Sequence, residues 1–160
     1  MKEKLYIFDT TLRDGAQTYG VDFNVDEKKI LASKLDELGV DYIEGGWPGA
    51  NATDTQFFNE KIEFKKSTFT SFGMTKKSGR SAENDPGLAS LINADTPSVC
   101  VVGKSWDFHV EVALEISNEE NVENIAQSVS FLSKNNKEVH FDAEHFFDGY
   151  KSNPDYAIQC

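Results

Sequence analysis

Short apolar segments alternate along the chain with longer segments in which apolar residues recur every three or four positions. The short segments predict strands and the longer ones predict amphipathic helices, because side chains repeat every two residues in a strand and every 3.6 in a helix. The predicted strands are residues 5–8, 42–44, 68–72, 98–102 and 139–142. Apolar strands separated by helices are typical of a parallel sheet covered by helices.

Capping signals mark where the helices begin: a polar N-cap residue followed three positions later by Glu or Gln, or directly by proline. The predicted starts are Asn24 with Glu27, Thr53 with Gln56, Asp85 with Pro86, Ser117 with Glu120, and Asn153 with Pro154. The apolar faces predicted for the first four helices are Ile30, Leu31, Leu35 and Leu38; Phe57, Phe58 and Ile62; Leu88, Leu91 and Ile92; and Val122, Ile125, Ala126, Val129 and Leu132. Gly39 ends the first helix, and residues 76–85 form a long loop between a strand and a helix.

Polar residues gather where the predicted strands end, at residues 9–14, 44, 104 and 142–145. Both barrels and doubly wound sheets place their sites there. The absence of a G-x-G-x-x-G or P-loop signature favours the barrel. A closed eight-stranded barrel takes about 250 residues. Residues 1–160 therefore predict the α/β fold of an N-terminal half of a (β/α)8 TIM barrel, with about five strands, four to five helices, no linker and the C-terminal half of the barrel absent.

Composition narrows the classes of partner. A hydrophobic content of 39% in 160 residues is enough for one sizeable core. The net charge of −11 argues against nucleic acid or an anionic membrane, and the nearest basic cluster, Lys76-Lys77 with Arg80, suits a phosphorylated small molecule or cofactor instead. No targeting or membrane-spanning segment is evident, and Cys100 lies in an apolar run, so we expect a cytoplasmic protein with a buried reduced thiol.

The segment Arg13-Asp14-Gly15-Ala16-Gln17 places a cation, a carboxylate and an amide just after the first strand. The carboxylate could hold a divalent metal, and the guanidinium could stabilise a developing oxyanion. The alternative is a turn that ends the strand and carries a surface salt bridge.

Four segments together carry a family resemblance: residues 8–17 (FDTTLRDGAQ), 41–49 (DYIEGGWPG), 103–110 (GKSWDFHV) and 141–151 (FDAEHFFDGYK). The first resembles the opening signature of the metal-dependent acyl-CoA Claisen-condensing and lyase barrels, which include 2-isopropylmalate, homocitrate and citramalate synthases and hydroxymethylglutaryl-CoA lyase. The other three look most like the citramalate synthase branch. The likeness spans essentially the whole chain.

The resemblance implies a condensation of acetyl-CoA with a 2-keto acid in isoleucine or leucine biosynthesis. Pyruvate, giving citramalate, is the first choice, and a 2-isopropylmalate synthase-type reaction is the second. A base removes a methyl proton from acetyl-CoA, the enolate attacks the ketone, and thioester hydrolysis follows. The resemblance also implies a divalent metal (Mn, Mg, Zn or Co) and a homodimer for the full-length parent.

The implied site residues are the catalytic Arg13 and Glu144, the metal ligand Asp14, and the substrate-binding Gln17, Glu44, Asp142 and Lys104. Gln17 could equally cap a turn, Glu44 could be an ion-paired surface residue, and alternation leaves Asp142 and Glu144 as equal candidates for the site carboxylate. His109 and His145 are either acid–base groups or structural residues, and His140 is expected to be packed lower in the barrel.

The family completes its metal site with a His-x-His pair from a later strand and an asparagine, and no His-x-His occurs in this chain. We therefore expect an incomplete metal site and no full reaction from these residues alone. Two alternatives remain. A Schiff-base aldolase would use Lys104 as its nucleophile. A non-catalytic half-barrel would bind a ligand or partner, or associate with itself through its open edges.

Overall fold

Five parallel strands form one sheet in the computed structural model, which describes residues 4–60 and 62–160. Residues 1–3, where the N-terminal segment examined for a targeting signal begins, lie outside the described part. The strands follow one another in chain order across the sheet. They are β1 (Phe8–Asp9), β2 (Tyr42–Glu44), β3 (Thr68–Met74), β4 (Ser98–Lys104) and β5 (Glu138–Glu144). Parallel strands in sequential order confirm the predicted succession of β–α units.

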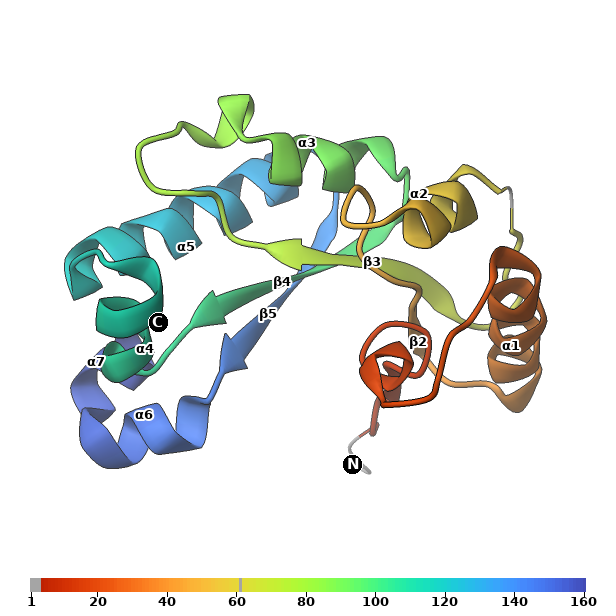
Figure 1. The fold of residues 1–160 in the computed structure, drawn as a ribbon, viewed down its shortest axis with the longest axis horizontal. Helices are drawn as coiled ribbons and strands as arrows, with labels where there is room; N and C mark the ends of the chain where they lie inside the picture. Colours follow the sequence, from red (N-terminus) through yellow and green to blue (C-terminus); the bar gives the residue numbers. More distant parts are fainter. Residues whose placement is uncertain (1–3, 61) are drawn as a thin grey trace.

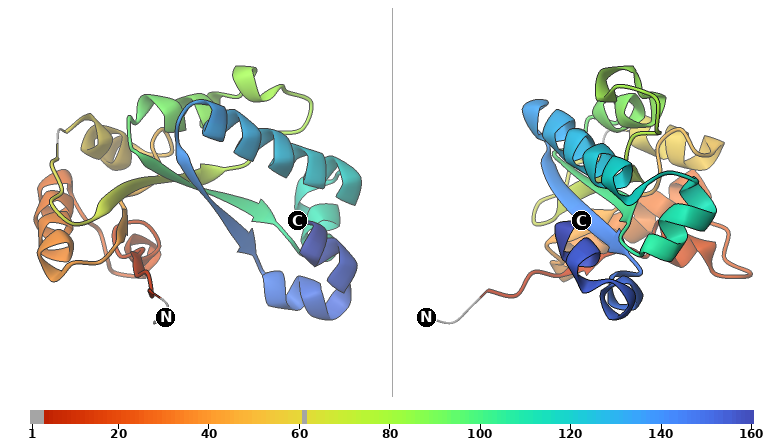
Figure 2. Two further views of the ribbon diagram at one scale, coloured as in Figure 1. Left: turned by 180° about the vertical axis from the view of Figure 1, so that it is seen from behind. Right: turned by 90° about the vertical axis from the view of Figure 1, so that its left-hand side faces the viewer.

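The sheet curves into an arch, and its longer helices lie on the outer side, as Figures 1 and 2 show. These helices are α1 (Val25–Leu38), α2 (Ala52–Asn59), α3 (Pro86–Asn93) and α5 (Asn118–Lys134). Shorter helical pieces follow the strand ends: η1 (Gly15–Gln17), η2 (Ala82–Asn84), α4 (Asp107–His109), η3 (Val110–Leu114, a π-helix), α6 (Phe146–Ser152) and α7 (Pro154–Gln159). None of the helices in the described part is both long enough and apolar enough to cross a bilayer.

The core lies between the outer face of the sheet and these helices. One buried cluster joins Val99 and Val101 of β4 to Leu88, Leu91 and Leu132 of α3 and α5. A second joins Leu12 and Ile43 to Ala32 and Phe57 of α1 and α2. Because side chains alternate along a strand, the residues between these core positions face the concave side of the arch. That inner set includes Glu44, Phe72, Cys100, Val102, Lys104, Asp142 and Glu144.

The structure corrects the limits of several strands. The first strand is residues 8–9 rather than 5–8, and Leu5, Tyr6 and Ile7 are exposed, Leu5 by 83%. Ile7 does accept hydrogen bonds from the backbone of Asp41 and Tyr42, but a strand with a neighbour on one side only buries little. Strands β3 to β5 instead run two residues beyond the predicted ends, so they carry Met74, Lys104 and Glu144 within the sheet.

The predicted caps are confirmed for α1, α3, α5 and α7. The cap of α2 is Asn51, whose side chain accepts the N–H of Asp54, and not Thr53. Two predicted core positions of α1 are wrong: Ile30 is 61% and Leu38 is 77% exposed. The face that is buried passes instead through Lys28, Ala32 and Asp36.

The predicted face of α5 is likewise too wide, because Ala126 is exposed. Polar residues occupy the buried side instead: Asn121, Asn124 and Ser128 are each exposed by 5% or less. Helices α4 and α6 were not predicted, because each is too short to show a helical period in the sequence.

Two buried acidic groups hold α1 and α2 in place. At the end of α1, Asp36 accepts the backbone N–H groups of Lys65, Lys66 and Ser67, which tie the helix to the start of β3. Burial acts to raise the pKa of Asp36, but these hydrogen bonds outweigh it and lower the pKa to about 2.

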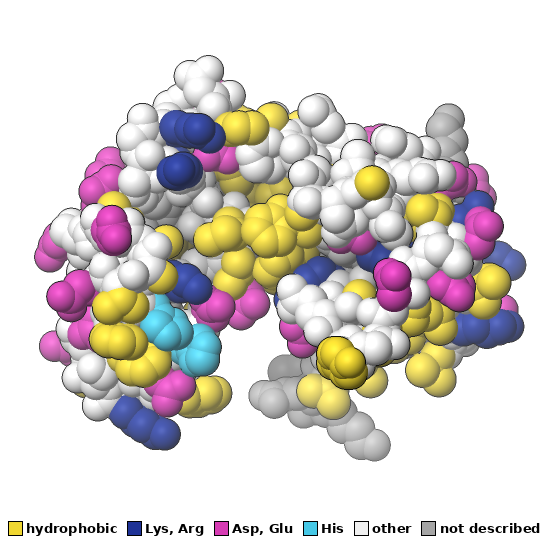
Figure 3. Space-filling view, in the orientation of Figure 1, with side chains coloured by type: hydrophobic (Ala, Val, Ile, Leu, Met, Phe, Trp, Pro, Cys, Tyr) yellow, Lys and Arg dark blue, Asp and Glu magenta, His cyan; other side chains and the backbone are white. Residues whose placement is uncertain are grey.

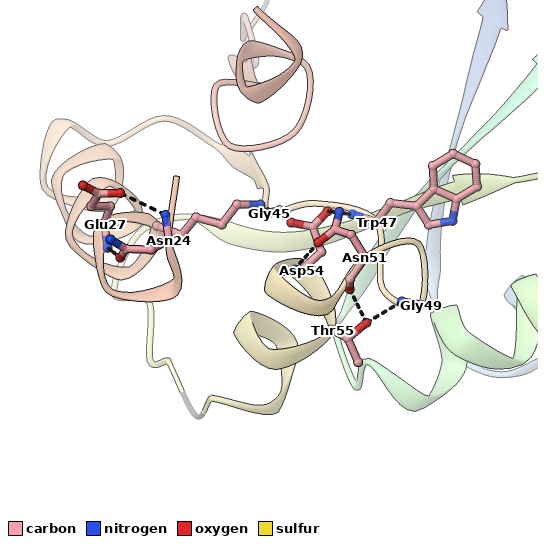
Figure 4. Close-up of polar contacts among 9 residues, drawn as sticks. Asn24, Glu27, Gly45, Trp47, Gly49, Asn51, Asp54 and Thr55 are labelled. Atoms are coloured by element: carbon pink, nitrogen blue, oxygen red, sulfur yellow. Dashed lines mark hydrogen bonds and ion pairs between the residues drawn. The ribbon is translucent and has the colours of Figure 1, made fainter. Parts of the chain in front are cut away.

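The second group is Asp54 of α2, which forms an ion pair with Lys28 of α1 inside the protein. Figure 4 shows the Asp54 carboxylate beside Asn51 and Trp47. Lys28 also donates to the carbonyl of Gly45 at 3.0 Å, and Asp54 accepts the N–H of Trp47 at 2.8 Å. Gly46 has φ of 146°, and a Cβ there would lie 2.6 Å from the Asp54 carboxyl carbon, so only glycine fits. The connection that follows β2 is therefore fixed from below by two helices.

Candidate active site

An open cavity of about 870 Å³ lies on the concave side at the carboxyl ends of the strands. Figure 3 shows it as a hollow with a hydrophobic floor, with acidic and basic side chains around it. Six of the seven predicted site residues line it: Arg13, Asp14, Gln17, Lys104, Asp142 and Glu144. The seventh, Glu44, does not. The structure thus brings together residues that are up to 131 positions apart in sequence, 144 − 13.

The turn after β1 sets the direction of the Arg13 side chain. The carbonyl of Thr10 accepts the N–H groups of Arg13, Asp14 and Gly15 at 3.1, 2.8 and 3.1 Å, which closes the chain into a tight turn. Leu12 is fully buried in the core below. Anchoring Leu12 in the core leaves its neighbour Arg13 to point into the cavity.

The guanidinium of Arg13 is held on three sides. Its Nε donates to Glu44 Oε2 at 2.6 Å, and its Nη1 donates to Asp14 Oδ1 at 3.2 Å. Its Cζ lies 3.9 Å from the centre of the Phe72 ring. Trp47 packs edge-on against Phe72, with the ring centres 5.6 Å apart. Within the described residues Nη2 has no hydrogen-bond partner, so it is available to a ligand in the cavity.

Glu44 lies beneath Arg13 and is only 1% exposed. Burial raises the pKa of Glu44, and the charge and hydrogen bond of Arg13 act in the opposite direction. Its second oxygen, Oε1, is buried without a hydrogen-bond partner in the described part of the chain. The geometry therefore makes Glu44 a residue that positions Arg13, and the predicted direct contact with substrate stays untested.

On the opposite wall, Lys104 of β4 and Glu144 of β5 form an ion pair. The backbone around this pair is also held: Ser105 Oγ donates to the Glu144 carbonyl at 2.8 Å, and Asn121 of α5 donates to the Lys104 carbonyl at 2.8 Å. The Glu144 carboxylate thus holds the Lys104 ammonium instead of leaving it free to meet a carbonyl carbon, so the geometry does not favour the Schiff-base alternative.

Asp142 lies one layer deeper than Glu144 on the same face of β5 and also lines the cavity. Burial raises its pKa, the nearby Arg13 lowers it, and Glu144 and Asp14 raise it again. The two carboxylates that the sequence could not separate thus differ in environment, because Glu144 has a lysine partner and Asp142 has none among the described residues.

The three histidines lie away from the cavity wall. His140 packs among Phe8 and Tyr42 lower in the sheet, with ring centres 5.3 and 4.7 Å away, as expected from the sequence. His109 and His145 contact each other edge to face at 4.7 Å, and His145 adopts a left-handed conformation with φ of 54°. Cys100 is buried and unpaired, and burial raises the pKa of its thiol, as expected for an unreactive cysteine.

The described residues do not by themselves form a metal centre. No group of three or more His, Cys, Asp or Glu side chains in residues 4–60 and 62–160 is arranged to hold a metal ion. Asp14 points into the cavity but already accepts a hydrogen bond from Arg13. A divalent ion needs several protein ligands, so Asp14 could supply only one of them.

Some contributors to the site were not predicted from the sequence. Trp47 supports the ring on which Arg13 stacks, while Lys28 and Asp54 hold the backbone that carries it. A buried Lys and Asp on two neighbouring helices leave no distinctive sequence signal, since each residue type alone is usually exposed.

Comparisons with known proteins show which proteins the chain is similar to. The HMGL-like family model matches residues 4–157. An (R)-citramalate synthase from Aquifex aeolicus is 52% identical over 161 residues, which cover 99% of this chain and 30% of that protein. A probable 2-isopropylmalate synthase from Methanopyrus kandleri is 35% identical over 159 residues, covering 99% of this chain and 30% of that protein. The chain therefore spans less than a third of these relatives.

Among solved structures, an HMG-CoA lyase from Bacillus subtilis superposes with a TM-score of 0.68 at 18% identity. The match covers 88% of this chain and 46% of the lyase. At this identity the likeness concerns the fold alone, and it confirms the predicted N-terminal half of a (β/α)8 barrel.

Proposed function

The chain belongs to the HMGL-like family, and from this membership we propose that it forms the keto-acid-binding half of a synthase that condenses acetyl-CoA with pyruvate to give citramalate. The single observation that supports this most directly is the placement of Arg13. Its guanidinium is fixed by Glu44 and Phe72, it lines the cavity, and its Nη2 has no hydrogen-bond partner among the described residues. A planar cation so placed suits a 2-keto acid, whose ketone oxygen and carboxylate both accept hydrogen bonds.

The proposed chemistry follows from where charge develops. When the enolate carbon of acetyl-CoA attacks the ketone carbon, a carbon–carbon bond forms and the ketone oxygen gains negative charge. Arg13 stabilises this oxygen because its orientation is set before the reaction begins. Glu144, on the facing wall, is the carboxylate proposed to move the proton, and its ion pair with Lys104 holds the Glu144 side chain in the cavity lining. Gln17 and Asp142 complete the lining of the pocket.

A divalent metal is part of the proposal, with Asp14 as one of its ligands. Bound near the ketone, such an ion polarises the carbonyl. Because the described residues supply one suitable ligand and not a full set, we assign no step to the ion and propose that these 160 residues alone do not complete the reaction.

Pyruvate is proposed over a longer keto acid because of the two relatives. Identity to the citramalate synthase is 52%, against 35% to the probable 2-isopropylmalate synthase over the same length of chain. A pocket separates substrates that differ by one or two carbons through only a few contacts, so a direct comparison of the two keto acids is needed.

The test is a chimera in which this chain replaces the matching segment of the Aquifex aeolicus (R)-citramalate synthase. We expect release of coenzyme A from acetyl-CoA in the presence of pyruvate and a divalent metal, and less release with 2-ketoisovalerate. Arg13→Lys should lower kcat/KM at least a hundredfold, because a lysine ammonium cannot bond Glu44 and a ligand with the same planar geometry.

Lys34→Arg, an exposed change on α1, is the matched control and should leave the rate unchanged. A folded chimera that does not condense acetyl-CoA with pyruvate would contradict the proposed function. So would an Arg13→Lys variant as active as the parent.

A further inference from the structure

The loop between β3 and α3 forms part of the cavity wall and carries three cations within five residues. Lys76, Lys77 and Arg80 all line the same cavity as Arg13 and Asp14. The protein as a whole has a net charge of −11. A local excess of positive charge at a cavity in an acidic protein draws anionic ligands to that place.

Three hydrogen bonds hold this loop in place, two of them through its backbone. Asp85 Oδ2 accepts the N–H of Lys77 at 2.9 Å, and Asn124 of α5 donates to Ser78 Oγ at 2.8 Å. Lys76 is buried, and its ammonium donates to the Arg80 carbonyl at 2.9 Å. The loop is therefore a built structure, and Lys76 is used in holding it.

A tight turn then brings the backbones of Lys77 and Arg80 together, and both residues line the cavity. The N–H of Arg80 donates to the carbonyl of Lys77 at 3.3 Å, and Gly79 between them has φ of 77°, which glycine adopts without strain. Both side chains are exposed, and within the described residues neither has a carboxylate partner or a side-chain hydrogen bond. Figure 3 shows Lys and Arg side chains grouped in this part of the face, beside the hydrophobic floor.

Among the described residues, no nearby carboxylate forms an ion pair with Lys77 or Arg80. Asp85 also lines the cavity, but its two oxygens accept the N–H groups of Lys77, Gly87 and Leu88. Glu83 is exposed in η2 and does not line the cavity. The carboxylate of a keto acid already has Arg13, so a second pair of cations in the same cavity calls for a second anionic group.

We propose that Lys77 and Arg80 bind the phosphate groups of the nucleotide part of a coenzyme A thioester, whose acyl end reaches Arg13 through the same cavity. This inference rests on the proposed function, because it concerns the second substrate of that reaction. It adds the residues that recognise the phosphates and the direction in which the thioester lies, from the β3–α3 loop toward the β1 turn.

The experiment is calorimetric titration of the 160-residue chain with coenzyme A and with pantetheine, which lacks the nucleotide and all its phosphates. For Lys77→Ala combined with Arg80→Ala we expect a dissociation constant for coenzyme A raised roughly tenfold or more and an unchanged constant for pantetheine. The coenzyme A affinity of the parent chain should also fall as salt is raised, and that of the variant should fall less.

Lys134→Ala is the matched control, because Lys134 is exposed at the far end of α5 and does not line the cavity. Equal affinity of parent and double variant for coenzyme A, no binding of coenzyme A by the parent, or an equal loss for coenzyme A and pantetheine would each overturn the proposal. The titration needs no turnover. Failure of the chimera to condense pyruvate is therefore a separate result, and it can be told apart from each of these three outcomes.

Discussion

At the scale of single residues, the most consequential contact is the one between Arg13 and Glu44. Arg13 contributes to binding only if its guanidinium plane is fixed, and Glu44 fixes it from a buried position that is not part of the cavity lining. The arrangement has a cost in stability, because burial of the carboxylate outweighs the attraction of Arg13 and raises the pKa of Glu44. The site therefore keeps a charged group that the fold alone does not favour.

Glu44→Gln should weaken pyruvate binding without lowering the stability of the fold. Since the pKa of Glu44 is raised in the folded state, its ionised form destabilises the protein at pH above that pKa, and the neutral amide removes this penalty. We expect an unfolding midpoint in urea at pH 8 equal to or above that of the parent. In the chimera, the KM for pyruvate should rise about tenfold, because the amide holds Arg13 less firmly than the carboxylate.

The exposed Glu37→Gln on α1 serves as the control for both measurements. A clear loss of stability at pH 8 would contradict the first expectation, and an unchanged KM would contradict the second.

At the scale of elements, α1 and α2 are joined to the end of β2 by the buried pair Lys28 and Asp54. This pair bonds the backbone of Gly45 and Trp47, the residues just beyond Glu44. Two helices on the outer side of the sheet thus determine the position of groups on its inner side.

Lys28→Met should destabilise the chain by about 3–5 kcal/mol, because it leaves the Asp54 charge buried without its partner. The double variant Lys28→Met with Asp54→Leu should recover part of that loss. Urea unfolding followed by circular dichroism measures both. Lys29→Met, which removes a partly exposed lysine next in sequence, should change stability by less than about 1 kcal/mol. A loss of stability of less than about 1 kcal/mol for Lys28→Met would show that water reaches Asp54.

The same elements show what a sequence reveals about this fold. Strand positions could be predicted because parallel strands buried on both sides read as apolar runs, and most caps could be predicted because their signals are local. The buried faces of α1 and α5 could not be predicted in full, because both contain polar residues. Lys28 and Asn124 read as solvent-exposed residues, and only the fold shows the ammonium on the Gly45 carbonyl and the amide on the β3–α3 loop.

The candidate site also has features that the sequence predicts and features that it does not. The residues Arg13, Asp14, Lys104 and Glu144 could be predicted to meet, because the ends of parallel strands share one edge of the sheet. The environments of Asp142 and Glu144 differ because Lys104 of β4 forms an ion pair with Glu144 of the neighbouring strand β5. The alternation of side chains along β5 alone does not reveal that ion pair. The place of Glu44 below Arg13, outside the cavity lining, likewise follows only from the packing between strands.

At the scale of the whole molecule, the arch has two open edges in the described part of the chain. There β1 pairs with β2 alone, and β5 pairs with β4 alone. Unpaired strand edges attract other strands. Next to the β1 edge lie the exposed side chains of Leu5, Tyr6 and Ile7. An edge that joins free backbone groups to apolar side chains favours contact with another chain.

We therefore expect the 160-residue chain to associate with itself as its concentration rises. Ile7→Lys should shift the distribution toward monomer, since a charge at a strand edge opposes pairing with another edge. Sedimentation velocity over a range of concentrations measures the shift. Ile30→Lys is the matched control, because Ile30 is comparably exposed but lies on α1, on the outer side of the arch. A parent chain that stays monomeric at high concentration, or equal effects of the two lysines, would mean that the β1 edge does not drive association.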